Sequence, residues 1–171
     1  MTSGGLDRRC HWLSKNKLSK RPEAILFLDA EAAIEQRSEK LQEHTFGLAA
    51  ATFCTYSAEN GLESVESRDF LDEIEIWNWT EELSREHEQL LIVAHNMDYD
   101  ARVCRAFFYL PRLGWSPSYC VMCSSCTLFV FERGERKITL LDNMNLWNSS
   151  LAQLGESVGL PKLHEIGRAH V

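Results

Sequence analysis

Two continuous apolar runs stand out in the hydrophobic pattern of the chain, residues 25–28 and 90–94. Short uninterrupted runs of Ile, Leu, Val and Phe are typical of strands that are buried on both faces of a sheet. The first run leads into Asp29 and Glu31, and the second leads through a short turn into Asp100. Because these carboxyl groups follow strands that leave the core, the pattern predicts a cluster of acids at strand ends, as metal sites require.

The same reasoning predicts strands along the rest of the chain. Apolar or alternating stretches bounded by turn residues predict strands at 24–30, 46–56, 62–66, 90–94, 119–123, 127–131 and 137–141. Asn60 and Gly61 are typical of a hairpin turn between the second and third of these strands. The polar stretch from Glu31 to Glu43 predicts a loop or a short helix.

Helical spacing of apolar residues predicts three helices. Ser67 caps the first, the second follows Asn96, and Ser149 or Ser150 caps the third. Their core-facing residues are, in order, Phe70, Ile74 and Trp77; Val103, Phe107 and Leu110; and Leu151, Leu154 and Val158. The residues that fit the ends of the last two helices are Pro111, Gly114, Gly159 and Pro161.

This order of elements predicts an α/β domain with a mixed central sheet flanked by helices. The length of 171 residues fits one domain, and 44% hydrophobic with 25% charged residues is ordinary for a globular chain. No early segment has the apolar core of a signal peptide, and no run of about 18 uncharged apolar residues would cross a membrane. We expect a cytoplasmic protein of a host or virus-infected cell with no membrane partner, although an organelle is also compatible.

The net charge of −7 is unevenly distributed along the chain. Residues 1–22 form a basic arm, because they hold six of the 18 Lys and Arg residues and one of the 25 Asp and Glu residues. Such an arm is either a mobile, solvated terminus or a tail that contacts phosphate groups. The acidic remainder argues against a surface that coats nucleic acid generally.

The closing residues, Ile166 to Val171, follow no periodicity. They can be written as the codons ATC GGA AGA GCA CAC GTC, which match a widely used sequencing-library adapter. We therefore expect residues 166–171 to be non-native read-through. The folded domain is then residues 23–165, and its natural continuation is missing.

Three segments resemble the DEDD-type 3′-5′ exonucleases of the ribonuclease-H-like superfamily, especially the proofreading domains of viral and organellar family B DNA polymerases. Asp29-Ala-Glu31 is similar to the first exonuclease motif, Asp-x-Glu. His95-Asn-Met-Asp-Tyr-Asp100 is similar to the second motif. Residues 140–145 and 150–160 are similar to the segment between the second and third motifs.

The resemblance implies a ribonuclease-H-like fold that is incomplete at the C-terminus. The third motif, a Tyr or His followed by a last Asp, is absent before residue 166. The implied activity is 3′-5′ hydrolysis of a single-stranded nucleic acid end, with DNA favoured and with a polymerase domain in the same full-length chain. This fragment would carry three of the four acids of the family.

The resemblance also implies a role for each site residue. Asp29 would bridge two Mg²⁺ or Mn²⁺ ions, Glu31 would bind one ion and orient the attacking water, and Asp100 would hold the other ion. Asn96 would contact the terminal nucleotide. Two such ions, about 3.5–4 Å apart, stabilise the charge that develops during phosphodiester hydrolysis, and oxygen ligands suit these hard cations.

Three assignments in this region have alternatives. Asp98 competes with Asp100 for the second-motif role, but Asp100 follows an aromatic residue at the family's spacing. Asn96 is equally well explained as a helix cap. Asp142 also follows a strand, and we interpret it as the partner of a helix or turn rather than as a catalytic acid.

Cysteines and tryptophans suggest binding functions that simpler explanations also cover. Cys120, Cys123 and Cys126 have the spacing of zinc or iron–sulfur ligands, but no fourth ligand is evident and we interpret them as small core residues. We expect all six cysteines to be reduced thiols. Exposed tryptophans stack on bases in single-strand binders, and Trp79 and Trp147 are the candidates for exposure.

Three hypotheses from different classes therefore arise. The chain is a metal-dependent exonuclease, a catalytically inactive nucleic-acid-binding module of the same fold, or a protein-interaction domain with its acids on the surface. The first predicts that Asp29, Glu31 and Asp100 lie close together. The third predicts that these carboxyl groups point apart into solvent.

Overall fold

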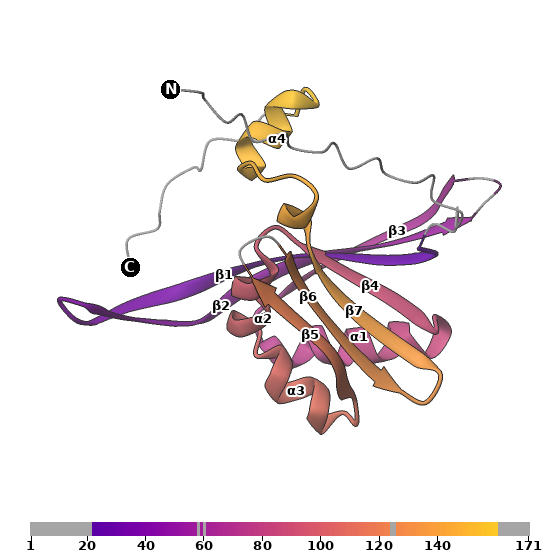
Figure 1. Cartoon of the computed structure of the whole chain (residues 1–171), viewed down its shortest axis with the longest axis horizontal. Coiled ribbons are helices and arrows are strands. Elements are labelled where there is room, and N and C mark those ends of the chain that lie inside the picture. The colour runs from indigo at the N-terminus through magenta and orange to yellow at the C-terminus, as the bar shows by residue number, and fades with distance from the viewer. Residues whose placement is uncertain (1–21, 58, 60, 124–125, 161–171) are drawn as a thin grey trace, which may run out of the picture.

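The computed structural model of the chain describes residues 22–57, 59, 61–123 and 126–160 (Figure 1). The predicted basic arm over residues 1–22 lies outside these residues, apart from Pro22. Pro161, predicted to stop the last helix, and the predicted read-through tail over residues 166–171 also lie outside the described residues.

Seven strands form one mixed sheet in the order β3-β2-β1-β4-β7-β6-β5. The strands are β1 (Ala24–Ser38), β2 (Leu41–Ser57), β3 (Gly61–Phe70), β4 (Gln89–Ala94), β5 (Ser116–Cys123), β6 (Cys126–Arg133) and β7 (Arg136–Asp142). β1 is parallel to β4 and β4 is parallel to β7, whereas the other neighbouring pairs are antiparallel. The predicted α/β domain with a mixed central sheet is confirmed.

Helices pack against this sheet from one face. They are α1 (Glu73–Glu86), α2 (Met97–Val103) and α3 (Ala106–Arg112), and their buried residues share one core with the strands. β1 shows which face is covered, because Leu26 and Leu28 are buried in this core while Phe27 between them is 42% exposed. The prediction that this strand is buried on both faces is therefore wrong for the described residues. None of the described helices is long and apolar enough to span a membrane.

The polar stretch from Glu31 to Glu43 is neither a loop nor a helix. β1 continues to Ser38, and β2 begins at Leu41, so the stretch belongs to a two-stranded ribbon that extends beyond the sheet at the left of Figure 1. Most side chains of this ribbon are exposed on both faces. Because neither face packs on the core, the sequence has no alternation of apolar and polar residues there, and the strand signal is missing.

The helix predicted after Ser67 begins later. Ser67 lies within β3, opposite Thr52, and its hydroxyl group is 2.9 Å from the Thr52 hydroxyl group. The cap of α1 is Asp72, whose carboxylate accepts a hydrogen bond of 3.0 Å from the backbone N–H of Ile74. An aspartate at this position also favours the positive end of the helix dipole.

The helix predicted after Asn96 is divided in two. α2 ends at Val103 and α3 begins at Ala106, because Arg105 adopts a left-handed backbone conformation with φ of 53°. Pro111 lies inside α3 rather than after it, and Gly114, with φ of 86°, follows the end of the helix. Phe107, predicted to face the core, is 45% exposed.

The last helix, α4 (Leu151–Ser157), begins as predicted. Ser150 caps it, and Gln153 completes a capping box with the backbone N–H of Ser150. Gly159 follows with φ of 76°, as a helix-ending glycine does. The described part of α4 has no buried residue.

Candidate active site

The two acidic motifs meet where β1 extends past the end of β4. The strands are parallel, and their pairing ends at Phe27 and Val93, so α2 occupies the space beside the next residues of β1. Oδ1 of Asp100 on α2 accepts a hydrogen bond of 3.0 Å from the backbone N–H of Ala30. Ala30 lies between Asp29 and Glu31, so the second motif touches the first.

Asp100 is a buried carboxyl group, and no cationic side chain of the described residues is among the groups that shift its pKa. Only 3% of its surface is exposed. Burial, followed by the charges of Asp29 and Asp142, raises its pKa from 3.8 to about 7, although the hydrogen bond from Ala30 acts in the opposite direction. The carboxyl group therefore gains or loses its proton near neutral pH.

Asp29 and Glu31 lie on the other face of β1 from the core. Both side chains are exposed, as expected for residues two apart on a strand whose alternate positions are buried. Asp29 is close enough to Asp100 for its charge to act on the buried carboxyl group. Burial raises the pKa of Tyr99, and the charges of Glu31 and Asp100 raise it further. Asp29 and Glu31, the acids of the first motif, therefore both act electrostatically on side chains of α2.

A β-bulge lies directly beside Glu31. The register between β1 and β2 shifts after Glu31, which pairs with Leu48, and Gly47 is the extra residue. A Cβ atom on Gly47 would lie 2.9 Å from the carbonyl oxygen of Glu31 and 3.1 Å from the nitrogen of Ala33. Only glycine permits this approach, and bulges often redirect side chains beside active sites.

Asp98 and Asp100 are separated by their surroundings. The carboxylate of Asp98 accepts a hydrogen bond of 2.8 Å from Nε of Arg102, one helical turn later, in an ion pair at the surface. Asp100 lies on the buried side of the same helix, against β1. The geometry therefore favours Asp100 over Asp98 as the acid that works with Asp29.

Asn96 occupies the N-cap position of α2 but does not cap it through its side chain. Its backbone is left-handed, with φ of 86°, and its amide group makes no capping hydrogen bond. Of its two explanations, the side-chain helix cap is therefore wrong. Asparagine tolerates this strained conformation better than most residues, and such strain often occurs at functional sites. The exposed amide group is available to a ligand.

Asp142 ends β7 beside Ala94, the last residue of β4. Its Oδ1 accepts hydrogen bonds from the backbone N–H of Met144 (2.8 Å) and of Asn96 (3.1 Å). The interpretation of Asp142 as a turn partner is thus confirmed. Its charge also raises the pKa of Asp100, so it belongs to the same acidic group. The sequence contained a signal for this placement. Parallel strands end at the same edge of a sheet, so an aspartate at the end of β7 is expected near Asp29.

The donor chemistry of this group fits a divalent cation. Asp29, Glu31 and Asp100 offer carboxylate oxygens, and the repulsion that raises the pKa of Asp100 is what a bound cation relieves. Within the described parts of the chain, no three His, Cys, Asp or Glu side chains are already grouped at metal-binding distance. Asp29 and Glu31 extend into solvent from the face of β1 opposite the core, so the structure brings Asp100 to the backbone of the first motif but does not bring the three carboxyl groups together as the first hypothesis predicts.

The cysteine pattern does not form a binding site of its own. Cys120 and Cys123 lie three residues apart on β5, so their side chains point to opposite faces of the sheet, and Cys123 pairs with Cys126 across the hairpin. The prediction that these cysteines are core residues is wrong for Cys120 and Cys123, which are exposed. Where the structure describes cysteines, none forms a disulfide, as predicted.

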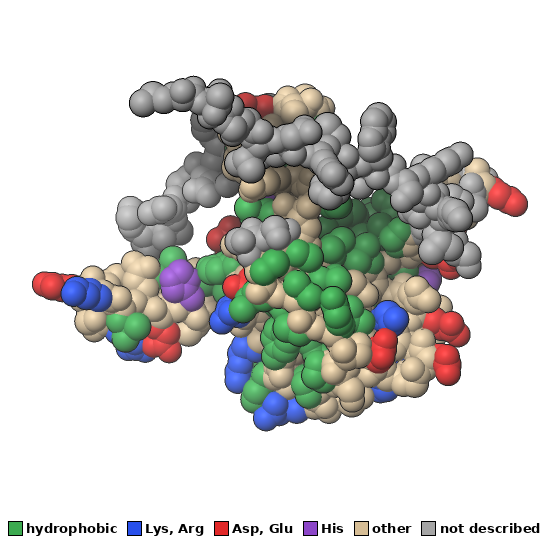
Figure 2. Space-filling model, in the orientation of Figure 1, with side chains coloured by type: hydrophobic (Ala, Val, Ile, Leu, Met, Phe, Trp, Pro, Cys, Tyr) green, Lys and Arg blue, Asp and Glu red, His purple; other side chains and the backbone are tan. Residues whose placement is uncertain are grey.

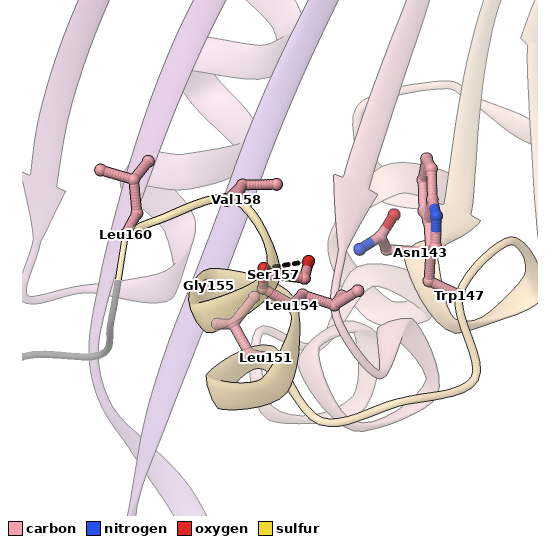
Figure 3. Close-up of a pocket in the computed structure, with 8 residues that line it drawn as sticks. All are labelled: Asn143, Trp147, Leu151, Leu154, Gly155, Ser157, Val158 and Leu160. Carbon is pink, nitrogen blue, oxygen red and sulfur yellow. Dashed lines mark hydrogen bonds between the residues drawn. The ribbon is translucent and has the colours of Figure 1, made fainter.

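Of the two tryptophans predicted to be exposed, one is. Trp79 is 2% exposed and packs against Phe53 and Phe70, whereas Trp147 is 54% exposed. Trp147 and Asn143 line an apolar pocket whose other walls come from α4 and the residues that follow it (Figure 3). None of the described residues that line this pocket has a titratable side chain.

A scan against protein-family models and searches of curated proteins and of solved structures found no match for this chain. The arrangement of Asp29, Glu31 and Asp100 is therefore the basis on which its function has to be argued.

Proposed function

We propose that this chain is a metal-dependent 3′-5′ exonuclease domain of the DEDD type. One observation carries the proposal: Oδ1 of Asp100 lies 3.0 Å from the backbone nitrogen of Ala30, between Asp29 and Glu31. A buried carboxyl group without a cation costs folding free energy. Groups with strongly perturbed pKa values in such positions are concentrated at functional sites.

We assign the fold to the ribonuclease-H-like class on the same basis. The support is that β1, β4 and β7 are parallel, that β2 is antiparallel to β1, and that α2 follows β4 with the second-motif acid. This arrangement places the carboxyl ends of β4 and β7 at the level of β1 where Asp29 lies. Substrates commonly bind outside the carboxyl ends of parallel strands.

Asp29, Glu31 and Asp100 would hold the divalent ions. Mg²⁺ or Mn²⁺ bound there supplies electrostatic stabilisation of the attacking and leaving oxygens. Asp100 loses its proton near neutral pH and so presents an anionic ligand where Asp29 also contributes one. Gly47 fixes the backbone from which Glu31 extends.

The substrate of the proposed activity is a single-stranded 3′ end, with DNA favoured. Asn96 supports this substrate class, because its amide group is exposed at the edge of the acidic group and bears donors and an acceptor for a nucleotide. The acids themselves repel phosphate, so binding of the terminal nucleotide depends on the ions.

Cleavage of a 5′-labelled single-stranded DNA oligonucleotide by the full chain tests the proposal, with an RNA oligonucleotide in parallel. We expect stepwise shortening from the 3′ end in Mn²⁺ or Mg²⁺, which EDTA stops. Asp29→Asn and Asp100→Asn should abolish it. Asp98→Asn is the matched control, because Asp98 lies on the same helix but engages Arg102 at the surface.

Calorimetric titration of the same variants with Mn²⁺ detects the ion site without turnover. Binding that Asp100→Asn removes and Asp98→Asn retains supports the assignment. The proposal fails if the unmodified chain neither binds Mn²⁺ nor shortens the oligonucleotide. It also fails if Asp98→Asn and Asp100→Asn have the same effect.

A catalytically inactive nucleic-acid-binding module is the second candidate. The observation that favours it is that no three acidic side chains of the described residues are grouped at metal-binding distance. This candidate predicts that the oligonucleotide binds in the presence of Mn²⁺ and keeps its length.

A further inference from the structure

Two cysteines lie opposite each other where β5 ends and β6 begins. Cys123, the last residue of β5, is the register partner of Cys126, the first residue of β6. Directly opposite residues of an antiparallel pair project from the same face of the sheet. Their Cα atoms are about 4.5–5.5 Å apart, which lies within the range that a disulfide bridges. The two side chains are therefore placed for a disulfide that this structure does not contain.

The fold distinguishes two cysteine pairs that the sequence makes equivalent. Residues 120–123 and residues 123–126 both have the spacing Cys-x-x-Cys. Cys120 lies on the same strand as Cys123, three residues before it and opposite Phe129, so its side chain points to the other face of the sheet. Cys123 can therefore bond to Cys126 within the native sheet, whereas a bond to Cys120 requires the end of β5 to unfold.

The residues beside both cysteines have partners outside the hairpin. Thr127 donates its backbone N–H to Oδ1 of Asn145 and accepts a hydrogen bond from Nδ2 of the same amide group, both at 2.8 Å. On the other strand, Sδ of Met122 lies 3.6 Å from Nη2 of Arg102 on α2. These contacts hold the ends of both strands in place, so the two cysteines stay opposite each other.

We propose that Cys123 and Cys126 form a reversible redox pair, which a small disulfide such as oxidised glutathione oxidises and a thiol reduces. The thiolate of Cys123, whose side chain is exposed, attacks one sulfur of oxidised glutathione and displaces one glutathione thiolate. The thiolate of Cys126 then attacks the sulfur of Cys123 in the mixed disulfide and displaces the second glutathione thiolate. The two cysteines lose two protons and two electrons, and the electrons reduce oxidised glutathione to two glutathione molecules.

Access and charge favour this pair over the other described cysteines. Cys54 and Cys104 are 6% and 0% exposed, so a small disulfide does not reach their thiols. Oxidised glutathione is an anion at neutral pH, and the chain has a net charge of −7, but residues 113–131 contain none of its Asp and Glu residues. Figure 2 shows hydrophobic side chains, coloured together with cysteine, over the β5 and β6 part of the visible face, with charged residues mainly around it.

The disulfide would act on the edge of the sheet. β5 is an edge strand that pairs with β6 alone, so a bond at its end ties it covalently to the sheet. An exposed thiol beside a second cysteine that can displace its modification is typical of redox sensors, and disulfides of proteins in reducing compartments are usually transient ones of this kind. β7 and β4 lie between β6 and β1, so the redox pair is independent of the proposed nuclease activity.

Mass spectrometry of the full chain after incubation with oxidised glutathione and alkylation of the remaining thiols tests the proposal. Trypsin leaves all three cysteines of the hairpin on one peptide, residues 113–133, and cyanogen bromide then cuts it at Met122. We expect the part with Cys120 to be alkylated and to separate from a part in which Cys123 and Cys126 have lost two hydrogen atoms. Dithiothreitol should reverse this loss.

Variants and an unfolded control make the test specific. Cys126→Ser should stop the reaction at a glutathione adduct on Cys123, whereas Cys120→Ser is the matched control and should still form the disulfide. In urea the two Cys-x-x-Cys pairs become equivalent, so bonds 120–123 and 123–126 should both appear. Circular dichroism shows whether each variant is folded.

The proposal is overturned if the folded, unmodified chain forms no bond between Cys123 and Cys126. It is also overturned if Cys123 bonds to Cys120 or to any other cysteine in the folded chain, or if Cys120→Ser and Cys126→Ser lose the disulfide equally.

Discussion

Three carboxyl groups among the described residues lose most of their contact with water, those of Glu81, Asp100 and Asp142. Asp100 on α2 and Glu81 on α1 have opposite surroundings. Glu81 is 9% exposed and accepts a hydrogen bond of 3.0 Å from Nε1 of Trp115. It also forms ion pairs with Arg133 and, at 3.8 Å, with Arg136. Burial alone would raise the pKa of Glu81, but these hydrogen bonds and charges lower it.

Asp100 has the reverse arrangement. Its described hydrogen-bond donors are backbone N–H groups, those of Ala30 and of Asp100 itself, and burial together with the charges of Asp29 and Asp142 raises its pKa to about 7. Arginine side chains therefore neutralise Glu81, which links α1 to the β6–β7 turn. No cationic side chain of the described residues is among the groups that act on Asp100, which lies between the two motifs. The difference indicates that Glu81 stabilises the fold, and it supports the proposal that Asp100 binds a cation from solution.

The largest expected effect is on catalysis. Asp100→Asn keeps the size of the side chain and an oxygen to accept the hydrogen bond from Ala30, but removes an anionic ligand. Loss of groups that merely support metal ligands costs about 10–100-fold, so removal of this ligand should lower 3′-end cleavage by more than about 100-fold. A single-turnover assay measures this effect. Cleavage at the unmodified rate would show that Asp100 does not bind the ion.

Glu81→Gln should lower the stability of the fold and leave Mn²⁺ binding unchanged. Removing the charge leaves Arg133, whose side chain is 25% exposed, without its carboxylate partner, so we expect a loss of roughly 2–4 kcal/mol of unfolding free energy, between the values for exposed and for fully buried pairs. Affinity for Mn²⁺ should stay unchanged, because Glu81 lies outside the acidic group. Urea denaturation and calorimetric titration measure the two quantities. A stable variant with weakened Mn²⁺ binding would reverse the roles that we assign to the two acids.

The two acids should also give opposite dependences of stability on pH. The pKa of Asp100 is higher in the folded protein, so its contribution to stability is present below pH 3.8 and is lost as the pH rises to about 7. The loss is roughly 4 kcal/mol at most, since one pKa unit corresponds to about 1.4 kcal/mol. The pKa of Glu81 is lowered, so its contribution is lost as the pH falls below the ordinary glutamate range.

Urea denaturation between pH 4 and pH 8 checks this prediction. Asp100→Asn should flatten the decline toward pH 7, whereas Glu81→Gln should retain it. Equal curves for the unmodified chain and Asp100→Asn over this range would show that Asp100 ionises as it does in the unfolded chain.

The smallest expected effect concerns the bulge beside Glu31. Gly47→Ala forces a Cβ atom to within 2.9 Å of the carbonyl oxygen of Glu31, so β1 and β2 have to separate locally. We expect a stability loss of about 1–3 kcal/mol, together with weaker Mn²⁺ binding. Gly134→Ala is the comparison, because it also replaces a glycine but no atom lies near the added Cβ. Equal Mn²⁺ affinity in both variants would remove the bulge from the site.

The strand pattern could be predicted where strands contribute to the core. β4, β6 and β7 were predicted to within two residues at each end. The signal was clear because every second residue of these strands is buried. The contact between the two motifs, in which Asp100 accepts a hydrogen bond from the backbone of Ala30, followed from the same logic, since the parallel strands β1 and β4 lead both motifs to the same part of the sheet. Local sequence and tertiary packing agree in these elements.

The remaining features depend on contacts that the local sequence does not encode. The ribbon that ends β1 and begins β2 has no buried face, so it shows no hydrophobic period. The division between α2 and α3 rests on the left-handed backbone of Arg105, for which arginine gives no signal. Trp79 is buried because Phe53 and Phe70 from β2 and β3 enclose it, and its neighbours in sequence do not reveal this.

The state of the Asp100 carboxyl group tests the central claim most directly. Carbon-detected NMR of the side-chain carboxyl carbon, followed over pH with and without Mg²⁺, reports its ionisation. The account predicts a pKa of about 7 without Mg²⁺ and a clear decrease when Mg²⁺ is added, because the cation stabilises the carboxylate. A pKa near 4 that Mg²⁺ leaves unchanged would contradict both the uncompensated burial of Asp100 and its role as an ion ligand.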